Sequence, residues 1–369
     1  MDNNIMYISL FAIFLLPGVM YAFMPYLTRK TESFGITVTE EIYKSERMNK
    51  IRKKYTLEAL FAVGITSLIT VFLFFKYPEP LNIYIYTVAL IVMLGILFFI
   101  YLKYYFIVKK LKEKEGWTAG KKQVVLTDMS FRKRKIQYSN VWFVIPLIIT
   151  AATAYLTYMN YDLIPEQIAM NYDLNGNPTN FKDKSFFTVF MPTITQVLMI
   201  GLFIFINNII SKAKQQIDPA DPENSAMQNE IFRRKWSGFI VVTGIMMIIL
   251  FSVMQISFFI PIEPGLLFAI TMGSTLVIVL GAFYLSFSLG QGGSRIITSF
   301  NKKGEEIDRD NDEHWKLGQF YFNPEDPAVF IEKRFGIGWT INFGSKKGII
   351  YIGILLVFII GSLLAERLG

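Results

Sequence analysis

The sequence predicts an all-α polytopic membrane protein with about eight transmembrane helices and a small β-rich module built from its cytoplasmic loops. Hydrophobic residues make up 53% of the 369 residues and charged residues only 18%, whereas soluble domains carry about 25% charged residues. Apolar runs of about 20 residues recur along the chain, which is the length needed to cross about 30 Å of hydrocarbon. Lys and Arg, 37 in total, fall almost entirely in alternate loops.

The predicted spans are, in order, residues 4–26, 56–75, 81–102, 140–159, 186–210, 237–260, 265–289 and 347–364. The second and third lie within residues 56–107, and the sixth and seventh form the pair 237–289, separated by a turn rich in Pro and Gly. The first run follows Asp2 and no basic residue, so we expect it to remain as a span rather than to be a cleaved signal.

The distribution of basic residues predicts the orientation. The intervening segments 27–55, 108–139, 211–236 and 290–346 are basic, and cytoplasmic loops retain Lys and Arg. The other side holds only Lys76, Lys182, Lys184 and Arg367. We therefore expect both termini and the loop 160–185 to face outward (N-out, C-out). A basic membrane face also accounts for the net charge of +8 better than a nucleic-acid surface does.

Several chemistries are excluded by composition. The chain has no Cys and one His, His314, which excludes disulfides, thiolate sites and zinc sites with two histidines. It contains no H-E-x-x-H or G-x-S-x-G motif. We therefore expect no catalytic residue, no metal site and no cofactor, and the chain is not predicted to be an enzyme.

Polar residues within the spans leave two interpretations open. Gln196, Asn207 and Gln255 lie inside apolar runs, whereas acidic and basic side chains are missing from the middle of every span. Hydrogen bonding between helices explains these amides most simply. A transporter that coordinates its substrate through broken helices and backbone carbonyls is the alternative.

Two loops carry candidate binding residues. Outside, Asn175-Gly176 favours a tight reversal, and the candidate ligand-binding residues of loop 160–185 are Pro165, Asn171, Tyr172, Asp173, Asn175, Gly176 and Lys184. Inside, residues 318–322, 329–333 and 339–343 are predicted strands, the last two joined by a turn at Gly336. The candidate module residues are His314, Trp315, Gly318, Tyr321, Asn323, Pro324, Asp326, Arg334, Gly336, Trp339 and Asn342.

Basic clusters beside the spans are predicted to contact anionic lipid headgroups. The residues are Arg132, Lys133, Arg134, Lys135, Arg233, Arg234 and Lys235. Short β-like runs at 34–38 and 123–126 are expected to join the module, because no single loop is long enough to bury a stable core.

Loop 160–185 resembles the external motif of the SdpI-like family of bacterial toxin-immunity membrane proteins. The matching residues are Ile164, Pro165, Ile168, Tyr172, Gly176, Pro178, Phe181 and Lys184. The departures from the pattern are Ala169, Asn171, Asp173 and Thr179, with Asn171 in place of a histidine. The segment from His314 to Asn342 is similar to a second uncharacterised domain that accompanies the first in bacterial membrane proteins.

The resemblance implies a multi-pass protein of the bacterial plasma membrane, of immunity or sensor type and without enzymatic activity. It would bind an antimicrobial peptide or envelope ligand outside and couple to a cytoplasmic regulator inside, with membrane lipids as further partners. A transporter or permease of a small or lipid-like substrate is the alternative.

Overall fold

The computed structural model describes residues 3–78, 80–117, 123–124, 136–172, 178–297, 307–308, 311–354 and 356. Within these residues, 6 helices are long and apolar enough to cross a membrane: Glu46–Lys76, Leu81–Glu115, Asn140–Met159, Phe186–Lys212, Pro222–Ile256 and Pro264–Gly293. A shorter apolar helix covers Leu10–Tyr26. The chain is therefore of the multi-pass membrane type. Of the predicted eighth span, only residues 347–354 and 356 are described, and they are helical.

The helices follow the predicted apolar runs but several extend beyond them. The helices are α1 (Asn3–Phe23), α2 (Glu40–Lys44), α3 (Glu46–Lys76), α4 (Leu81–Glu115), α5 (Val144–Met159), α6 (Phe186–Lys212), α7 (Pro222–Ile256) and α8 (Pro264–Leu289). Helix α3 begins ten residues before its apolar run, where Ser45 accepts a hydrogen bond from the Met48 amide. Helix α4 ends at Gly116, which has the left-handed conformation that closes helices. Hydropathy locates the membrane-crossing part of a helix and misses the polar turns that continue it.

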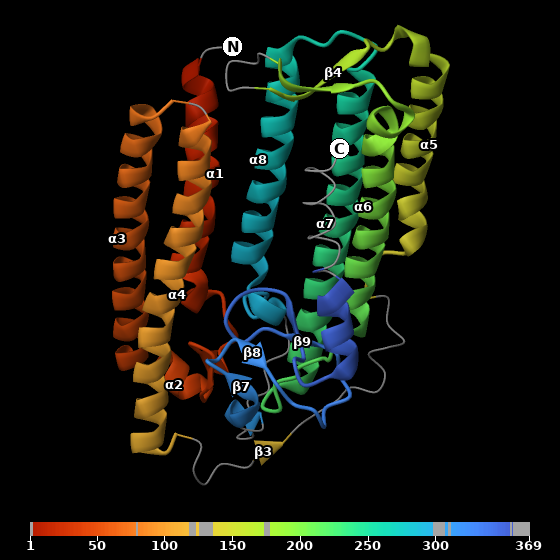
Figure 1. The fold of residues 1–369 in the computed structure, drawn as a ribbon. Helices are drawn as coiled ribbons and strands as arrows, with labels where there is room; N and C mark the ends of the chain where they lie inside the picture. Colours follow the sequence, from red (N-terminus) through yellow and green to blue (C-terminus); the bar gives the residue numbers. More distant parts are fainter. Residues whose placement is uncertain are drawn as a thin grey trace.

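The bundle consists of two groups of three helices. Helices α1, α3 and α4 pack together, as do α5, α6 and α7, and α8 lies between the groups in contact with α1 and α7 (Figure 1). The outward faces are apolar: Leu68 of α3 is 72% exposed and Phe99 of α4 is 70% exposed. Such faces are expected where a helix meets lipid rather than a protein core.

Among the described residues, the strands form five pairs. These are β1 (Glu32–Ser33) with β2 (Ile36–Thr37), β3 (Gln123–Val124) with β6 (Ile307–Asp308), β4 (Gln167–Tyr172) with β5 (Pro178–Asp183), β7 (Trp315–Lys316) with β8 (Phe320–Tyr321), and β9 (Phe330–Glu332) with β10 (Trp339–Ile341). The predicted hairpin around Gly336 is confirmed, since Glu332 pairs with Trp339. The β4–β5 hairpin lies at one end of the bundle and strands β7 to β9 lie at the other (Figure 1).

The C-terminal module, residues 311–344, closes its end of the bundle through an aromatic core. Phe335 of the module is 4% exposed, and its ring centroid lies 4.2 Å from that of Tyr101 and 6.1 Å from that of Phe34. Phe34 lies in the β1–β2 turn, with its ring centroid 5.2 Å from that of Tyr55 in α3. The module, the first loop and two helices thus share one buried cluster, as predicted for loops too short to fold alone.

Candidate functional site

The β4–β5 hairpin is fixed to the bundle by a small apolar cluster. Ile164 and Ile168 are 2% and 4% exposed and pack with the fully buried Val189 of α6. The chain between β5 and α6 is held by Lys184, whose Nζ donates to the Ile164 carbonyl at 2.9 Å and lies 4.9 Å from the centre of the Tyr161 ring. The Lys184 side chain is only 10% exposed. Lys184 therefore helps to position the hairpin, and its predicted contact with a ligand stays a prediction.

Of the remaining predicted ligand-binding residues, the structure describes Pro165, Asn171 and Tyr172. Pro165 is exposed beside the hairpin. Asn171 and Tyr172 belong to β4, and Asp173, Asn175 and Gly176 lie outside the described residues. The ligand-binding role of this loop therefore stays a prediction.

At the opposite end of the bundle, four predicted module residues form one hydrogen-bond network. The Asn342 amide nitrogen donates to the carbonyls of Asn323, Asp326 and Ala328 at 2.7, 3.2 and 3.2 Å. The Asn342 side-chain oxygen accepts from the Asn323 amide at 3.0 Å. The Tyr321 hydroxyl donates to Asp326 at 2.9 Å. These residues hold the chain between β8 and β10. Their side chains therefore stabilise the fold of the module.

Other predicted module residues pack it or set its turns. Trp315 is 2% exposed and stacks near Tyr321, with ring centroids 5.1 Å apart. Trp339 lies over Phe232 of α7. Gly318 and Gly336 have positive φ of 69° and 112°. Pro324 is exposed.

One contact between module and bundle is a buried ionic cluster that we call the Glu332 cluster: Glu332, Arg29 and Arg233. Glu332 and Arg233 have fully buried side chains and their charged atoms are 2.7 Å apart. Arg29, which follows α1, pairs with the second oxygen of Glu332. Arg233 also donates to the carbonyls of Ile210 and Ala213 at 2.6 and 3.0 Å, near the end of α6. One carboxylate on β9 therefore joins α1, α6 and α7.

A second ionic group, the Arg334 cluster, joins the module to α4 and the first loop. Arg334 pairs with Asp312, and Asp312 accepts from Lys112 of α4 at 2.7 Å. Arg334 also donates to the Gly35 carbonyl at 3.2 Å. Burial alone would raise the pKa of Asp312, but the neighbouring Arg334 and Lys112 outweigh it and hold this pKa below its ordinary value.

A third link runs through Gln291, which follows α8. Its side-chain amide donates to the carbonyls of Lys333 and Gly338 at 3.1 and 2.9 Å and accepts from the Gly338 amide at 2.8 Å. Gln291 is fully buried. Both three-helix groups, and the segment after α8, are thus joined to the β9–β10 hairpin by polar side chains.

Sequence reasoning missed Arg29, Lys112, Gln291, Asp312 and Glu332. One signal was present: the predicted strand 329–333 is a largely apolar run that places the charged Glu332 on the same face as Phe330. A charge at a core-facing strand position indicates a buried partner. The sequence could not name that partner, because Arg233 is 99 residues away.

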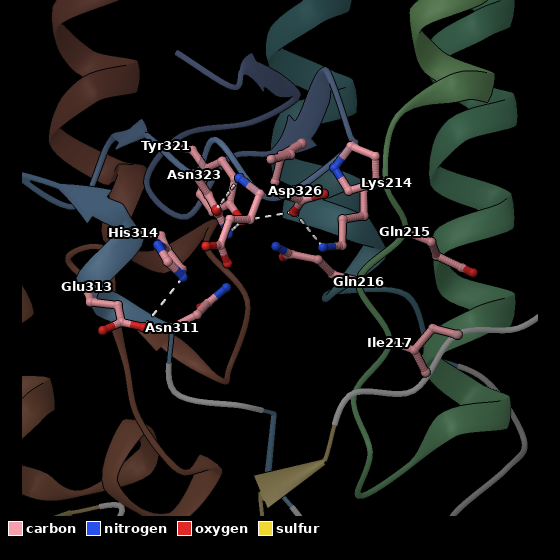
Figure 2. Close-up of a pocket in the computed structure, with 13 residues that line it drawn as sticks. Lys214, Gln215, Gln216, Ile217, Asn311, Glu313, His314, Tyr321, Asn323 and Asp326 are labelled. Atoms are coloured by element: carbon pink, nitrogen blue, oxygen red, sulfur yellow. Dashed lines mark hydrogen bonds and ion pairs between the residues drawn. The ribbon is translucent and has the colours of Figure 1, made fainter. Parts of the chain in front are cut away.

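Beside these clusters, a cavity of about 460 Å³ lies between the module and the segment that follows α6. Figure 2 shows Asp326 approached by Lys214, at 2.7 Å, and by the Tyr321 hydroxyl. His314 lines the same cavity, with its Nε2 3.4 Å from a Glu313 oxygen. The outer wall is polar and includes the amides of Gln216, Asn311 and Asn323. Such a wall suits a ligand or peptide that forms hydrogen bonds.

The acidic character of this cavity lies at its rim, because Tyr321 stays protonated and Asp326 is neutralised by Lys214. Burial raises the pKa of Tyr321 to about 12, and the Asp326 carboxylate adds to the effect. Burial opposes ionisation of Asp326, yet the hydrogen bond from Lys214 leaves the pKa of Asp326 below its ordinary value. Asp326 is therefore ionised at neutral pH and neutralised by Lys214. Glu313 and Glu325 are exposed at the rim, so the rim favours a basic ligand.

The basic clusters differ from their prediction in one respect. Arg233 is fully buried in the Glu332 cluster, so its guanidinium is not available to a lipid headgroup. Its neighbours Arg234 and Lys235 are exposed. Arg132, Lys133, Arg134 and Lys135 lie outside the described residues.

Inside the bundle, the three predicted polar residues behave differently. Asn207 is satisfied: it donates to the Tyr138 carbonyl and to Asn140 at 3.0 and 2.8 Å, and accepts from Ser237 at 2.6 Å. Gln255 accepts from Thr193 at 2.9 Å. Gln196 is fully buried, and neither of its amide atoms has a hydrogen-bond partner.

Two segments of the chain match known families. Residues 148–195 match a domain of unknown function, DUF1648, and this segment contains most of α5, the β4–β5 hairpin and the first turns of α6. Residues 324–349 match a family of unknown function, DUF5808, and this segment contains β9 and β10 with Glu332 and Arg334. Neither match carries the SdpI-like name, so that resemblance stays a prediction. No curated protein and no solved structure matches the chain.

Proposed function

We propose that this protein is a non-enzymatic sensor or immunity protein of the cell envelope. It would bind an antimicrobial peptide or another envelope ligand at the β4–β5 hairpin and relay that event to a cytoplasmic regulator at the C-terminal module. The observation that carries the proposal is that the β4–β5 hairpin of one family-matched segment lies at the end of the bundle opposite the other matched segment (Figure 1). The same helices contact both of them.

Helices α6 and α7 provide the physical route. Helix α6 starts next to the hairpin, where Val189 packs on Ile168, and ends where its last carbonyls bind Arg233. Helix α7 carries Arg233 into the Glu332 cluster, and Phe258 and Phe259, which follow it, pack against the hairpin cluster. A displacement of the hairpin would therefore act on the ion pairs that hold the module, and such coupling would require these contacts to have two alternative arrangements.

The regulator is expected to dock at the cavity of Figure 2. Its rim carries Glu313 and Glu325, and its wall includes the partly exposed amide side chains of Gln216, Asn311 and Asn323. A basic or amide-rich segment of a regulator would match this surface. The bacterial plasma membrane, with the module inside, is the location that fits the basic loops.

Site-specific crosslinking in living cells tests both ends of the proposal. A photo-crosslinking residue at Glu166, whose side chain is 90% exposed beside the hairpin, should capture an envelope peptide. One at Glu325 should capture a cytoplasmic protein. Deletion of the gene should change sensitivity to antimicrobial peptides or change transcription of a regulated gene. Unchanged sensitivity together with unchanged transcription would refute the proposal.

A transporter is the second candidate, and Gln196 is the observation that favours it. The contacts of Thr193 with Gln255 and of Phe203 with Gly244 fix the register of α6 on α7, which places Ser252 level with Gln196. Both residues, and Thr150 of α5, are at least 96% buried and leave polar atoms without hydrogen-bond partners. Unsatisfied polar atoms in lipid are costly, and transporters place such groups on the substrate path.

Cysteine accessibility separates the two candidates, because the chain has no native cysteine. A transporter path would let a small thiol reagent modify Ser252→Cys, and substrate would slow the reaction. The matched control is Ile248→Cys, one turn away on α7 and fully buried in an apolar cluster. Equal resistance of both variants to modification would exclude a path at this level and favour the sensor.

A further inference from the structure

Arg52 is a buried cation at the start of α3 whose described surroundings contain no carboxylate partner. The residue is 3% exposed. Its guanidinium donates to the Tyr43 carbonyl at 2.8 Å and to the Asn49 side chain. It lies 4.2 Å from the centre of the Tyr43 ring and 5.9 Å from that of Tyr26. Its Nε and Nη1 atoms are buried without a hydrogen-bond partner.

This arrangement differs from the other buried arginines of the protein. Arg233 and Arg334 each pair with a carboxylate, Glu332 and Asp312 respectively. A buried charge without a counter-charge is unfavourable, because the desolvation of the ion is not offset. Two tyrosine rings recover part of that cost by cation–π attraction. The unused N–H groups point to an anion that completes the site.

The position of Arg52 indicates which anion. The apolar run of α3 begins at about residue 56, so Arg52 lies about 6 Å outside it at 1.5 Å per residue. That depth is the level of lipid phosphates, just beyond the hydrocarbon core. Tyr26 and Tyr43 are only partly buried, as is typical of tyrosines at the membrane interface. A guanidinium is also the side chain best suited to pair with two phosphate oxygens.

We propose that Arg52, flanked by Tyr26 and Tyr43, binds the phosphate group of an anionic lipid at the membrane surface. The Tyr43 ring lies against the guanidinium, so binding requires this ring to move aside. Bound phosphate neutralises Arg52 and links the first loop to the lipid surface. The shared chemistry is a phosphate oxyanion, and free phosphate in solution is the other source of it.

Native mass spectrometry of the full-length protein tests the site. Retention of phosphatidylglycerol is compared with retention of phosphatidylcholine for the wild type, Arg52→Gln and Arg52→Lys. The control is Lys53→Gln, which removes the same charge from an exposed neighbour on α3. We expect Arg52→Gln to bind phosphatidylglycerol about tenfold more weakly, as loss of a charge-assisted hydrogen bond predicts, and Arg52→Lys to retain part of the binding. Lys53→Gln should bind like the wild type.

Two further measurements use the wild-type protein, so they decide the question even if Arg52→Gln does not fold. A photoactivatable anionic lipid should crosslink to the segment from Tyr43 to Arg52. Thermal unfolding in phosphatidylcholine nanodiscs with added inorganic phosphate identifies the source: stabilisation by phosphatidylglycerol but not by phosphate supports the lipid. Stabilisation by phosphate alone would overturn the lipid assignment. Equal retention of both lipids, or crosslinks that avoid this segment, would overturn the site.

Discussion

Glu332 illustrates how much of the coupling between bundle and module depends on a single side chain. Its two oxygens pair with Arg29 and Arg233, and Asn229 donates to it at 2.8 Å. Glu332→Gln leaves two arginines facing a neutral amide. Removing one partner of a buried ion pair costs about 3–5 kcal/mol, so we expect the module to detach from α7. Limited proteolysis in detergent should then cleave the module faster than in the wild type.

The control for that variant is Glu325→Gln, which removes an exposed carboxylate of the same module. An exposed charge contributes only about 1 kcal/mol or less, so its cleavage rate should match the wild type. Equal protection of Glu332→Gln and wild type would show that the apolar contacts around Phe335 suffice to hold the module.

Asp312 gives the attachment a pH dependence whose sign follows from its lowered pKa. Arg334 and Lys112 hold the pKa of Asp312 below the ordinary value of 3.8, against the opposing effect of burial. A carboxyl with a lowered native pKa stabilises the folded state fully above its unfolded pKa, and that contribution is lost as pH falls through the native pKa. We expect the protection of the module to decrease progressively as pH falls below about 4, the ordinary pKa of an Asp side chain. Proteolysis from pH 7 to pH 3 measures this.

Asp312→Asn is the variant that assigns the pH effect. It removes the titrating group, so the module should be less protected at pH 7 and its protection should fall less steeply on acidification. Asp326 also has a lowered pKa through Lys214, and the matched variant Asp326→Asn should retain the Asp312 contribution. A variant at Asp312 with the pH profile of the wild type would assign the acid sensitivity elsewhere.

At the scale of elements, the β1–β2 turn shows why the module needs the first loop. Gly35 has φ of +80°, and a Cβ there would collide with the backbone of Gly318. Gly35→Ala therefore adds both backbone strain and a clash between two backbones that cannot yield easily. We expect a lower unfolding temperature and faster proteolysis of the module.

Gly338→Ala separates the two causes. Gly338 also has positive φ, +96°, but a Cβ there meets no atom within 4 Å. This variant introduces the backbone strain without the clash, which lowers the free energy of unfolding by about 1 kcal/mol. Its loss of stability should therefore be smaller than that of Gly35→Ala. Equal losses would mean that the close approach of Gly35 to Gly318 contributes nothing.

At the scale of the whole molecule, the apolar runs of the sequence predicted the helices, whereas the partners of residues distant in sequence could not be predicted. Apolar runs predicted the helices because lipid demands such runs whatever the tertiary contacts. The β9–β10 hairpin was predictable because Gly336 and alternating side chains act locally. The partners of Glu332 and Gln291 were not, since a charge in a strand states only that a partner exists. The burial of Lys184 and Arg233 was not predictable for the same reason, since exposure depends on neighbours distant in sequence.

The orientation of the bundle is the prediction on which the proposed function depends. Basic residues gather at the end of the bundle that carries the module, and they are sparse around the β4–β5 hairpin, so the module should be cytoplasmic. Because the chain lacks cysteine, Glu166→Cys and Glu325→Cys give single labelling sites without background. An impermeant maleimide should label Glu166→Cys in intact cells and Glu325→Cys only after permeabilisation. The reverse pattern would place the hairpin inside the cell, where it could not meet an envelope peptide, and the sensor proposal would fail with it.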